Sequence, residues 1–265
     1  MYEIDENGFL EGRIYGWVAE HRDRHAVLFT AMRELNQACH RFLDGRVVDV
    51  TSEVHITSAV LFARLVELFQ GVFIAVEHGM TAVGRILFRA HLEAFFYLMA
   101  IYSDPAFLGD YLDQLQVYRK TLVNRIRNSS EVSLAPLREA LHEDLTRQID
   151  ETIKEQRIRR LTTEEAARRA GLHGVYATAY AVLSGAVHTT AWDLESHLDY
   201  DDGERAIRRF KYGPSDSDTE RLLGLAGMDM AEALKTISTI FGEDRAESCT
   251  RFKNQFQAVL DKSMV

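Results

Sequence analysis

GRILFRAHLEAFFYL, from Gly84 to Leu98, is the stretch that decides the fold. It is apolar on most faces, which is typical of a buried helix. Its polar residues are Arg85, Arg89, His91 and Glu93. Buried charges are costly unless they are paired and hydrogen-bonded. We therefore expect this helix to lie at the centre of the protein and to find polar partners on another helix.

The composition indicates a globular helical protein. Of the 265 residues, 46% are hydrophobic and 27% are charged, and the chain is long enough to bury a sizeable core. Only three prolines occur, which favours helix throughout. The net charge of −9 disfavours nucleic-acid binding by the surface as a whole, although a local basic patch can still bind it.

Several features predict a soluble, cytoplasmic protein. The two cysteines form neither a disulfide framework nor a zinc-binding spacing. The opening residues MYEIDENG lack the basic and apolar parts of a signal peptide. The longest uncharged apolar run, around residues 94–103, is shorter than the roughly 20 residues that span a bilayer. We expect no membrane association.

Apolar residues spaced by three and four predict long helices along most of the chain. The expected helices cover residues 14–42, 52–78, 81–103, 105–128, 136–160, 162–171, 174–198, 219–241 and 243–262. A bend is expected near Thr189–Thr190, and a short extended segment or ordered loop near 205–213. No internal repeat or linker divides the chain. We predict one all-α domain over residues 1–265, with 129–171 as a charged helical excursion.

Two of these helices carry polar stripes. On the helix of residues 81–103, the residues spaced by four are Arg85, Arg89 and Glu93, so Arg89 can pair with Glu93. On the helix of residues 174–198, the residues spaced by four are Tyr176, Tyr180, Ser184 and His188. Two apolar helices with one polar stripe each are buried most favourably when the stripes face each other. The sequence therefore predicts an internal polar cluster.

Two interpretations of this cluster stay open. In the first it is a catalytic or ligand site, where arginines hold a phosphate or carboxylate. His188 is then an acid or base, and Ser184 or a tyrosine orients it. In the second it is a buried polar network that determines the register of the two helices.

The run GRxLFRAHLEAFFYL, followed by EEAARRAGL and YxxxYxxLSGAVHTTAW, resembles an uncharacterised bacterial all-helical family known only as a domain of unknown function. The recurring marks of that family are Arg-x-x-x-Glu on one helix and Tyr-x-x-Leu-Ser-x-x-x-His on a later one. Here they are Arg89 with Glu93, and Tyr180 with Ser184 and His188. The resemblance covers about residues 60 to 200 and implies no established activity.

More distantly, the chain resembles the HEPN superfamily of helical ribonucleases, many of which are toxins or antiviral effectors. Their mark is an Arg and a His four to six residues apart on one helix, and five residues separate Arg85 from His91. Six helical steps set these two side chains ~120° apart, and Ile86 stands where that family has a polar residue.

The HEPN resemblance implies a metal-independent ribonuclease in bacterial defence, whose Arg and His act on the RNA phosphate and 2′-hydroxyl, often across a dimer. RNA, an antitoxin-like protein and a second copy of the chain are the partners it implies. The candidate catalytic residues are Arg85, Arg89, His91, Glu93, Tyr180, Ser184 and His188. The alternative is a non-catalytic helical module that binds a small anionic ligand or a protein partner through the same cluster.

A basic segment near residue 210 is a candidate nucleic-acid-binding site. Its cations are Arg205, Arg208, Arg209 and Lys211, and Phe210 and Tyr212 between them are suited to stack on unpaired bases. The alternative is a solvated charged face. His21 and His25, four residues apart, are either a metal pair or helix-face histidines. Without a zinc spacing or phosphate-binding loop, we expect neither a metal nor a cofactor.

Overall fold

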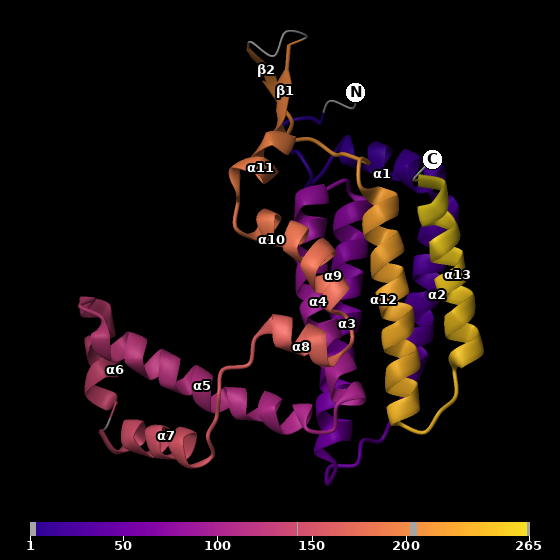
Figure 1. Cartoon of the computed structure of the whole chain (residues 1–265). Coiled ribbons are helices and arrows are strands. Elements are labelled where there is room, and N and C mark those ends of the chain that lie inside the picture. Colours follow the sequence, from indigo (N-terminus) through magenta and orange to yellow (C-terminus); the bar gives the residue numbers. More distant parts are fainter. Residues whose placement is uncertain (1–3, 142, 202–205, 264–265) are drawn as a thin grey trace.

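The computed structural model describes residues 4–141, 143–201 and 206–263. Long helices form a bundle, with a helical arm projecting from one side and a small hairpin at one end (Figure 1). The bundle helices are α2 (Ala26–Leu43), α3 (Glu53–Glu77), α4 (Thr81–Ser103), α12 (Thr219–Ile240) and α13 (Ala246–Ser263), with α1 (Ile14–Arg24) across one end. The predicted all-α fold class is confirmed.

α3 and α4 form the centre of the bundle. They pack extensively against each other, and α12 packs against both. The core that they share contains four fully buried rings, Phe62, Phe69, Phe88 and Phe96. The stretch GRILFRAHLEAFFYL forms the middle of α4 and is central, as predicted.

Short-range signals set both ends of α3. The sequence offers Thr51 or Ser52 as the cap of α3, and the Ser52 hydroxyl fills this role by accepting a hydrogen bond from the His55 backbone N–H. Gly79 ends it with φ +70°, and a Cβ there would lie 2.6 Å from the Trp17 ring. Only glycine fits both the left-handed geometry and this close approach.

Among the described residues, α3 is the helix that is long and apolar enough to cross a membrane by length and composition alone. Half of its most apolar window is buried in the bundle.

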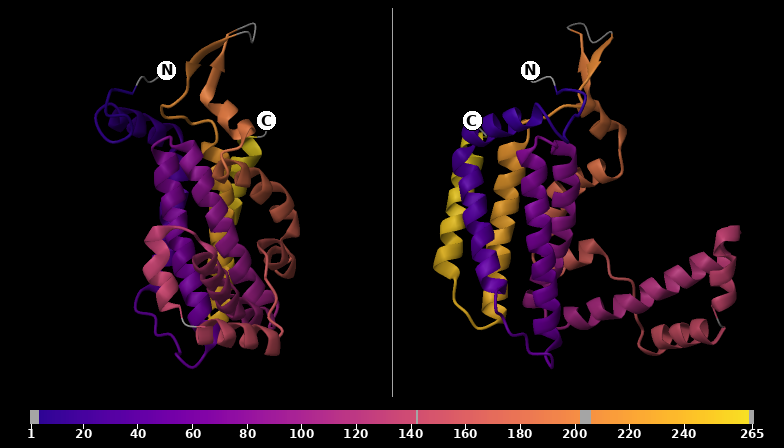
Figure 2. Two further views of the ribbon diagram at one scale, coloured as in Figure 1. Left: turned by 90° about the vertical axis from the view of Figure 1, so that its left-hand side faces the viewer. Right: turned by 180° about the vertical axis from the view of Figure 1, so that it is seen from behind.

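The single helix predicted over residues 14–42 is wrong, because the chain turns at His25 between α1 and α2. The His21 ring is buried at this turn, within hydrogen-bonding distance of the Glu77 carbonyl (3.2 Å) and the Thr219 hydroxyl (2.9 Å). α1 can therefore lie across the end of the bundle while α2 runs along it (Figure 2). The apolar spacing is continuous through the break, so periodicity alone does not reveal it.

The arm begins at α5 (Phe107–Asn128) and continues through η1 (Val132–Leu134), α6 (Ala135–Ala140) and α7 (Glu143–Glu155). Phe107 and Leu108 anchor α5 in the core, and α7 folds back along the outer part of α5. The predicted helix of residues 136–160 is instead two helices, because the chain leaves helical geometry at Leu141.

The spacing of the apolar residues along α5 predicts one stripe that faces inward from Leu108 to Ile126, and this prediction is wrong for the outer part of the helix. Its outer residues Leu112, Leu115, Tyr118 and Leu122 are exposed. The projecting part therefore starts within α5, before residue 129. It ends before α8 (Thr163–Arg169), where Ala166 and Ala167 are buried against the core.

The segment after α8 runs back along α4 and ends in the hairpin. Thr162 and Glu165 have the spacing of a capping box, and the Thr162 hydroxyl caps α8 as that pattern predicts. The chain bends at Thr189 (φ +51°), as predicted, before Thr190 caps the next helix. The elements are α9 (His173–Val175), the π-helix η2 (Tyr176–Tyr180), α10 (Ala181–Val187), α11 (Ala191–Leu194), η3 (Glu195–His197), β1 (Leu198–Tyr200) and β2 (Ile207–Phe210). β1 and β2 pair antiparallel, which confirms an extended segment there.

Candidate functional site

The two predicted polar stripes meet between α4 and α10. Arg89 on α4 donates a hydrogen bond from Nε to the Ser184 hydroxyl on α10 (3.3 Å) and another from Nη1 to Glu93 Oε2 (3.3 Å). The Tyr180 hydroxyl donates to the same Glu93 oxygen (3.3 Å), and the Arg89 guanidinium carbon lies 4.7 Å from the centre of the Tyr180 ring. We call these four residues the Arg89 cluster.

The π-helix η2 positions the tyrosine of this cluster. A π turn contains more residues than an α turn, so it rotates the residues that follow it. Tyr176 stacks on Tyr180 at 5.0 Å between ring centres, and Ser184 donates its hydroxyl to the Tyr180 carbonyl (2.9 Å). Single-turn π segments occur frequently at functional sites. Here the segment directs the Tyr180 hydroxyl toward Glu93.

The cluster is half-buried, since the Arg89 side chain is 23% exposed and the Glu93 side chain 34%. Burial and the Glu93 carboxylate raise the pKa of Tyr180, and the same two causes raise the pKa of Tyr97 and Tyr111 nearby. These phenols therefore stay protonated, and Tyr180 remains a hydrogen-bond donor to Glu93. The cluster has one cation, one carboxylate and two hydroxyl groups, and it is partly exposed to solvent.

Arg85 belongs to a separate network one turn earlier on α4. Its Nε atom donates to Asp218 Oδ2 (2.8 Å) at the start of α12, and its Nη1 atom lies 3.6 Å from Asp193 Oδ1 on α11. Arg221 also pairs with Asp218 at 3.1 Å. This network ties α11 and the start of α12 to α4. Sequence reasoning missed both aspartates, since no spacing relates them to Arg85.

His91 lies in the core and does not join the Arg89 cluster. The side chain is fully buried near the rings of Phe69 and Phe88, and neither ring nitrogen makes a well-formed hydrogen bond to a described residue. Burial lowers its pKa to about 4, and the Leu65 backbone offsets only part of that effect. The helical rotation between Arg85 and His91 separates them, so this pair does not form a site on the surface.

His188 lies at the edge of the cluster and is not an internal member of it. α10 ends at Val187, and the His188 backbone N–H donates to the Ser184 carbonyl (3.1 Å) while its side chain is exposed. The exposed Trp192 ring follows, and a Cβ added at Gly185 would lie 3.9 Å from it. The expected internal histidine is thus a solvent-facing group one turn beyond Ser184.

The basic segment lies on the hairpin. Arg208 and Lys211 are exposed, as are the rings of Phe210 and Tyr212. Arg209 pairs with Asp199 across the two strands at 2.5 Å. Arg205, the fourth predicted cation, lies outside the described residues. Figure 1 shows that the chain rises directly from α10 through α11 into this hairpin.

The described ranges contain no group of three or more His, Cys, Asp or Glu residues that could hold a metal ion. Both ring nitrogens of His21 are already engaged, and burial lowers its pKa. His25 lies 3.5 Å from Glu220. These two histidines therefore serve the junction between α1, α3 and α12.

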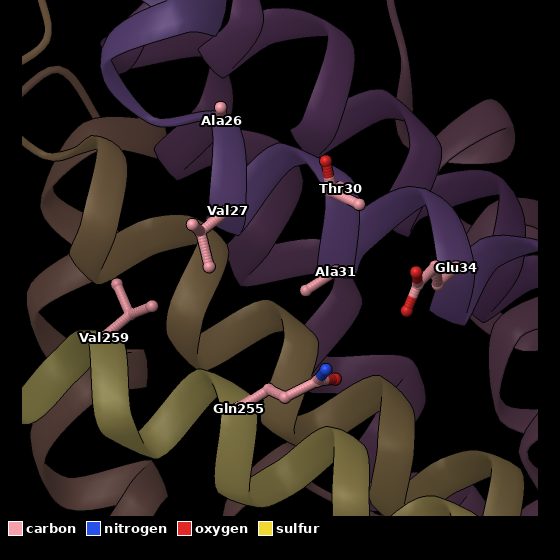
Figure 3. Close-up of a pocket in the computed structure, with 7 residues that line it drawn as sticks. All are labelled: Ala26, Val27, Thr30, Ala31, Glu34, Gln255 and Val259. Atoms are coloured by element: carbon pink, nitrogen blue, oxygen red, sulfur yellow. The ribbon is translucent and has the colours of Figure 1, made fainter.

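A groove of about 340 Å³ lies between α2 and α13, distant from the Arg89 cluster (Figure 3). Small, apolar and polar side chains line it, namely Ala26, Val27, Thr30, Ala31, Glu34, Gln255 and Val259. Glu34 is the titratable residue in this lining. The groove therefore offers no constellation of catalytic groups comparable to the Arg89 cluster.

In a comparison with protein families, residues 55–205 match DUF5677, a family of unknown function. Comparisons with curated proteins and with solved structures give no match. The matched region includes all of α4 and the segment from α8 to α11, so it contains the whole Arg89 cluster and His188. The resemblance to an uncharacterised family is confirmed. The chain belongs to the DUF5677 family of unknown function.

Proposed function

We propose that this protein binds single-stranded RNA on the face that runs from the Arg89 cluster past His188 and Trp192 to the β1–β2 hairpin, and that His188 and Arg89 cleave the RNA there. The observation that carries the proposal is the exposed His188 side chain one turn beyond Ser184, to which Arg89 is bound. The distant HEPN resemblance adds the expectation of a cytoplasmic bacterial defence effector or toxin.

The hairpin supports the binding part of this proposal. Single-stranded nucleic acids are bound by cations that follow the backbone and by aromatic rings that stack on bases. Arg208 and Lys211 supply exposed cations, while Phe210 and Tyr212 supply exposed rings. Because the chain as a whole is acidic, this attraction is local and confines RNA to one end of the molecule.

The cleavage step needs no metal ion. His188 accepts the proton of a 2′-hydroxyl as that oxygen attacks the adjacent phosphorus, and the 5′-oxygen leaves after taking a proton from water. The products are a 2′,3′-cyclic phosphate and a 5′-hydroxyl. Arg89 neutralises the negative charge that develops on the phosphoryl oxygens. Glu93, Tyr180 and Ser184 hold Arg89 in one orientation for this role.

The test uses a short fluorescent single-stranded RNA with the full-length protein in EDTA. We expect His188→Ala to abolish cleavage while it leaves RNA affinity within about twofold of wild type. Phe210→Ala combined with Tyr212→Ala should weaken binding at least tenfold. His40→Ala is the matched control, since His40 is an exposed histidine on α2. Intact RNA with the wild type, or equal cleavage by His188→Ala, refutes the proposed reaction.

A second candidate is a non-catalytic module in which the Arg89 cluster binds a small anion. The Arg89 guanidinium is held through Nε and Nη1, and no described residue accepts a hydrogen bond from its Nη2 atom. A carboxylate or phosphate can occupy that position. In calorimetric titrations with inorganic phosphate, this candidate predicts binding that Arg89→Gln removes and His188→Ala preserves. RNA cleavage that needs His188 would exclude a purely non-catalytic role.

A further inference from the structure

The outer part of α5 carries an apolar stripe that the described chain leaves uncovered. Leu112 is 39% exposed, Leu115 51%, Tyr118 66% and Leu122 46%. Their spacings of three and four place them on one side of the helix. α7 covers a different side, where Val123 and Ile149 are buried.

This stripe lies on an arm that stands clear of the bundle. In Figure 1 and the right view of Figure 2, α5 leaves the bundle near its first turns and extends away from it. An exposed row of large apolar side chains on a projecting element is typical of a surface for another protein. Apolar residues spaced by three and four form the contact face where two helices pack together. An amphipathic helix can therefore pack its own apolar face against this stripe.

The charges beside the stripe indicate what kind of helix fits. Arg119 and Arg125 are both exposed on the outer part of α5, and no described residue pairs with either of them. By helical geometry they border the stripe on opposite sides, while Asp113 points about half a turn away from it. The stripe is therefore apolar with cationic margins, on a chain that has 40 acidic and 31 basic residues.

We propose that the outer half of α5 binds an amphipathic helix of another protein, with leucine-like residues on one face and Asp or Glu on both margins of that face. Opposite charges at the margins steer association and select the partner. A second copy of α5 fits less well, because a symmetric antiparallel pair centred near Tyr118 brings the two Arg119 side chains toward each other. Like charges in such a position disfavour pairing.

The proposal is tested by fluorescence anisotropy with the full-length protein and two labelled synthetic 20-residue helices. Both peptides carry the same leucine face, and the margins are all Glu in one and all Lys in the other. We expect the Glu peptide to bind at least tenfold more tightly than the Lys peptide. That preference should shrink at high salt, because salt screens the marginal charges.

Substitutions on α5 test whether its apolar stripe is the surface that binds the peptide. Leu115→Ser combined with Leu122→Ser should weaken Glu-peptide binding at least tenfold, whereas Arg119→Glu combined with Arg125→Glu should reverse the preference between the peptides. Val27→Ser, at an exposed apolar residue on α2, is the matched control and should change nothing. The four α5 side chains substituted in these variants are all exposed, so the melting curves of the variants by circular dichroism should match that of the wild type.

Three results would overturn the proposal. The first is equal affinity for the two peptides, and the second is loss of binding in Val27→Ser but not in the α5 variants. The third comes from sedimentation velocity: a concentration-dependent dimer that Leu115→Ser with Leu122→Ser dissociates would make a second copy the occupant. None of these readouts depends on RNA cleavage, so the outcome is independent of the proposed ribonuclease activity.

Discussion

The Nε atom of Arg89 on α4 lies 3.3 Å from the hydroxyl of Ser184 on α10, although ninety-five positions of sequence separate the two residues. This contact, with the Glu93–Tyr180 hydrogen bond beside it, attaches the α8–α11 segment to the centre of the bundle. The cluster thus has a structural role whether or not a ligand binds it. Substitutions there must be followed by stability and by activity separately.

Arg89→Ala should lower the free energy of unfolding by about 1–2 kcal/mol, because it leaves the half-buried Glu93 carboxylate without its cation. Arg89→Ala combined with Glu93→Gln should recover part of that loss, since the uncompensated charge is then removed. Urea unfolding at pH 7 measures both variants. Equal stability of wild type and Arg89→Ala would show that solvent already screens this pair.

His91 should make the protein less stable in mild acid. Its pKa is lowered from 6.5 to about 4 by burial, so the unfolded chain binds a proton that the folded chain excludes. The contribution of neutral His91 to the free energy of unfolding is therefore fully present above pH 6.5 and is lost as the pH falls toward 4. The loss is about 2 kcal/mol at pH 5. His91→Leu should remove this component, as measured by urea unfolding at pH 7.5 and pH 5. If His91→Leu abolished RNA cleavage without unfolding the protein, the core assignment would be contradicted.

Asp229 on α12 should act in the opposite direction. Burial raises its pKa from 3.8 to about 7, and Lys253 offsets this only in part. Folding is therefore favoured below pH 3.8 by this group, and that contribution is lost as the pH rises through 7. Asp229→Asn should stabilise the protein at pH 8 by about 1 kcal/mol, an amount reduced because the residue as a whole is only partly buried and lies near a cation. Thermal melts at pH 5 and pH 8 test this, and a gain at pH 5 alone would refute it.

Gly227→Ala should destabilise the bundle. A Cβ at this position of α12 would lie 2.6 Å from atoms of the Phe256 ring on α13, and both residues are buried. Relieving this overlap requires the two helices to move apart, which costs about 1–3 kcal/mol. Gly109→Ala on α5 is the control, because nothing lies within 4 Å of a Cβ there. Calorimetry should show a lower Tm for Gly227→Ala and an unchanged or slightly higher one for Gly109→Ala.

Much of the secondary structure could be predicted, because its signals act over a few residues. Ser52 and Thr162 cap helices through their own hydroxyls, and Gly79 ends one through backbone geometry that other residues avoid. The facing of Arg89 and Ser184 also followed from sequence, since spacing by four shows which residues share one side of a helix. Such signals need no knowledge of the rest of the chain.

The sequence by itself thus determined an all-α chain, the ends of most helices and which side of each helix is apolar. Only the tertiary structure decided what covers each side: His91 enters the core, His188 faces solvent, and the stripe of α5 extends beyond the bundle. It also supplied Asp193 and Asp218 as the partners of Arg85. The physical reason is that periodicity reports the direction of a side chain about its own helix axis, whereas burial depends on segments that arrive from distant parts of the chain.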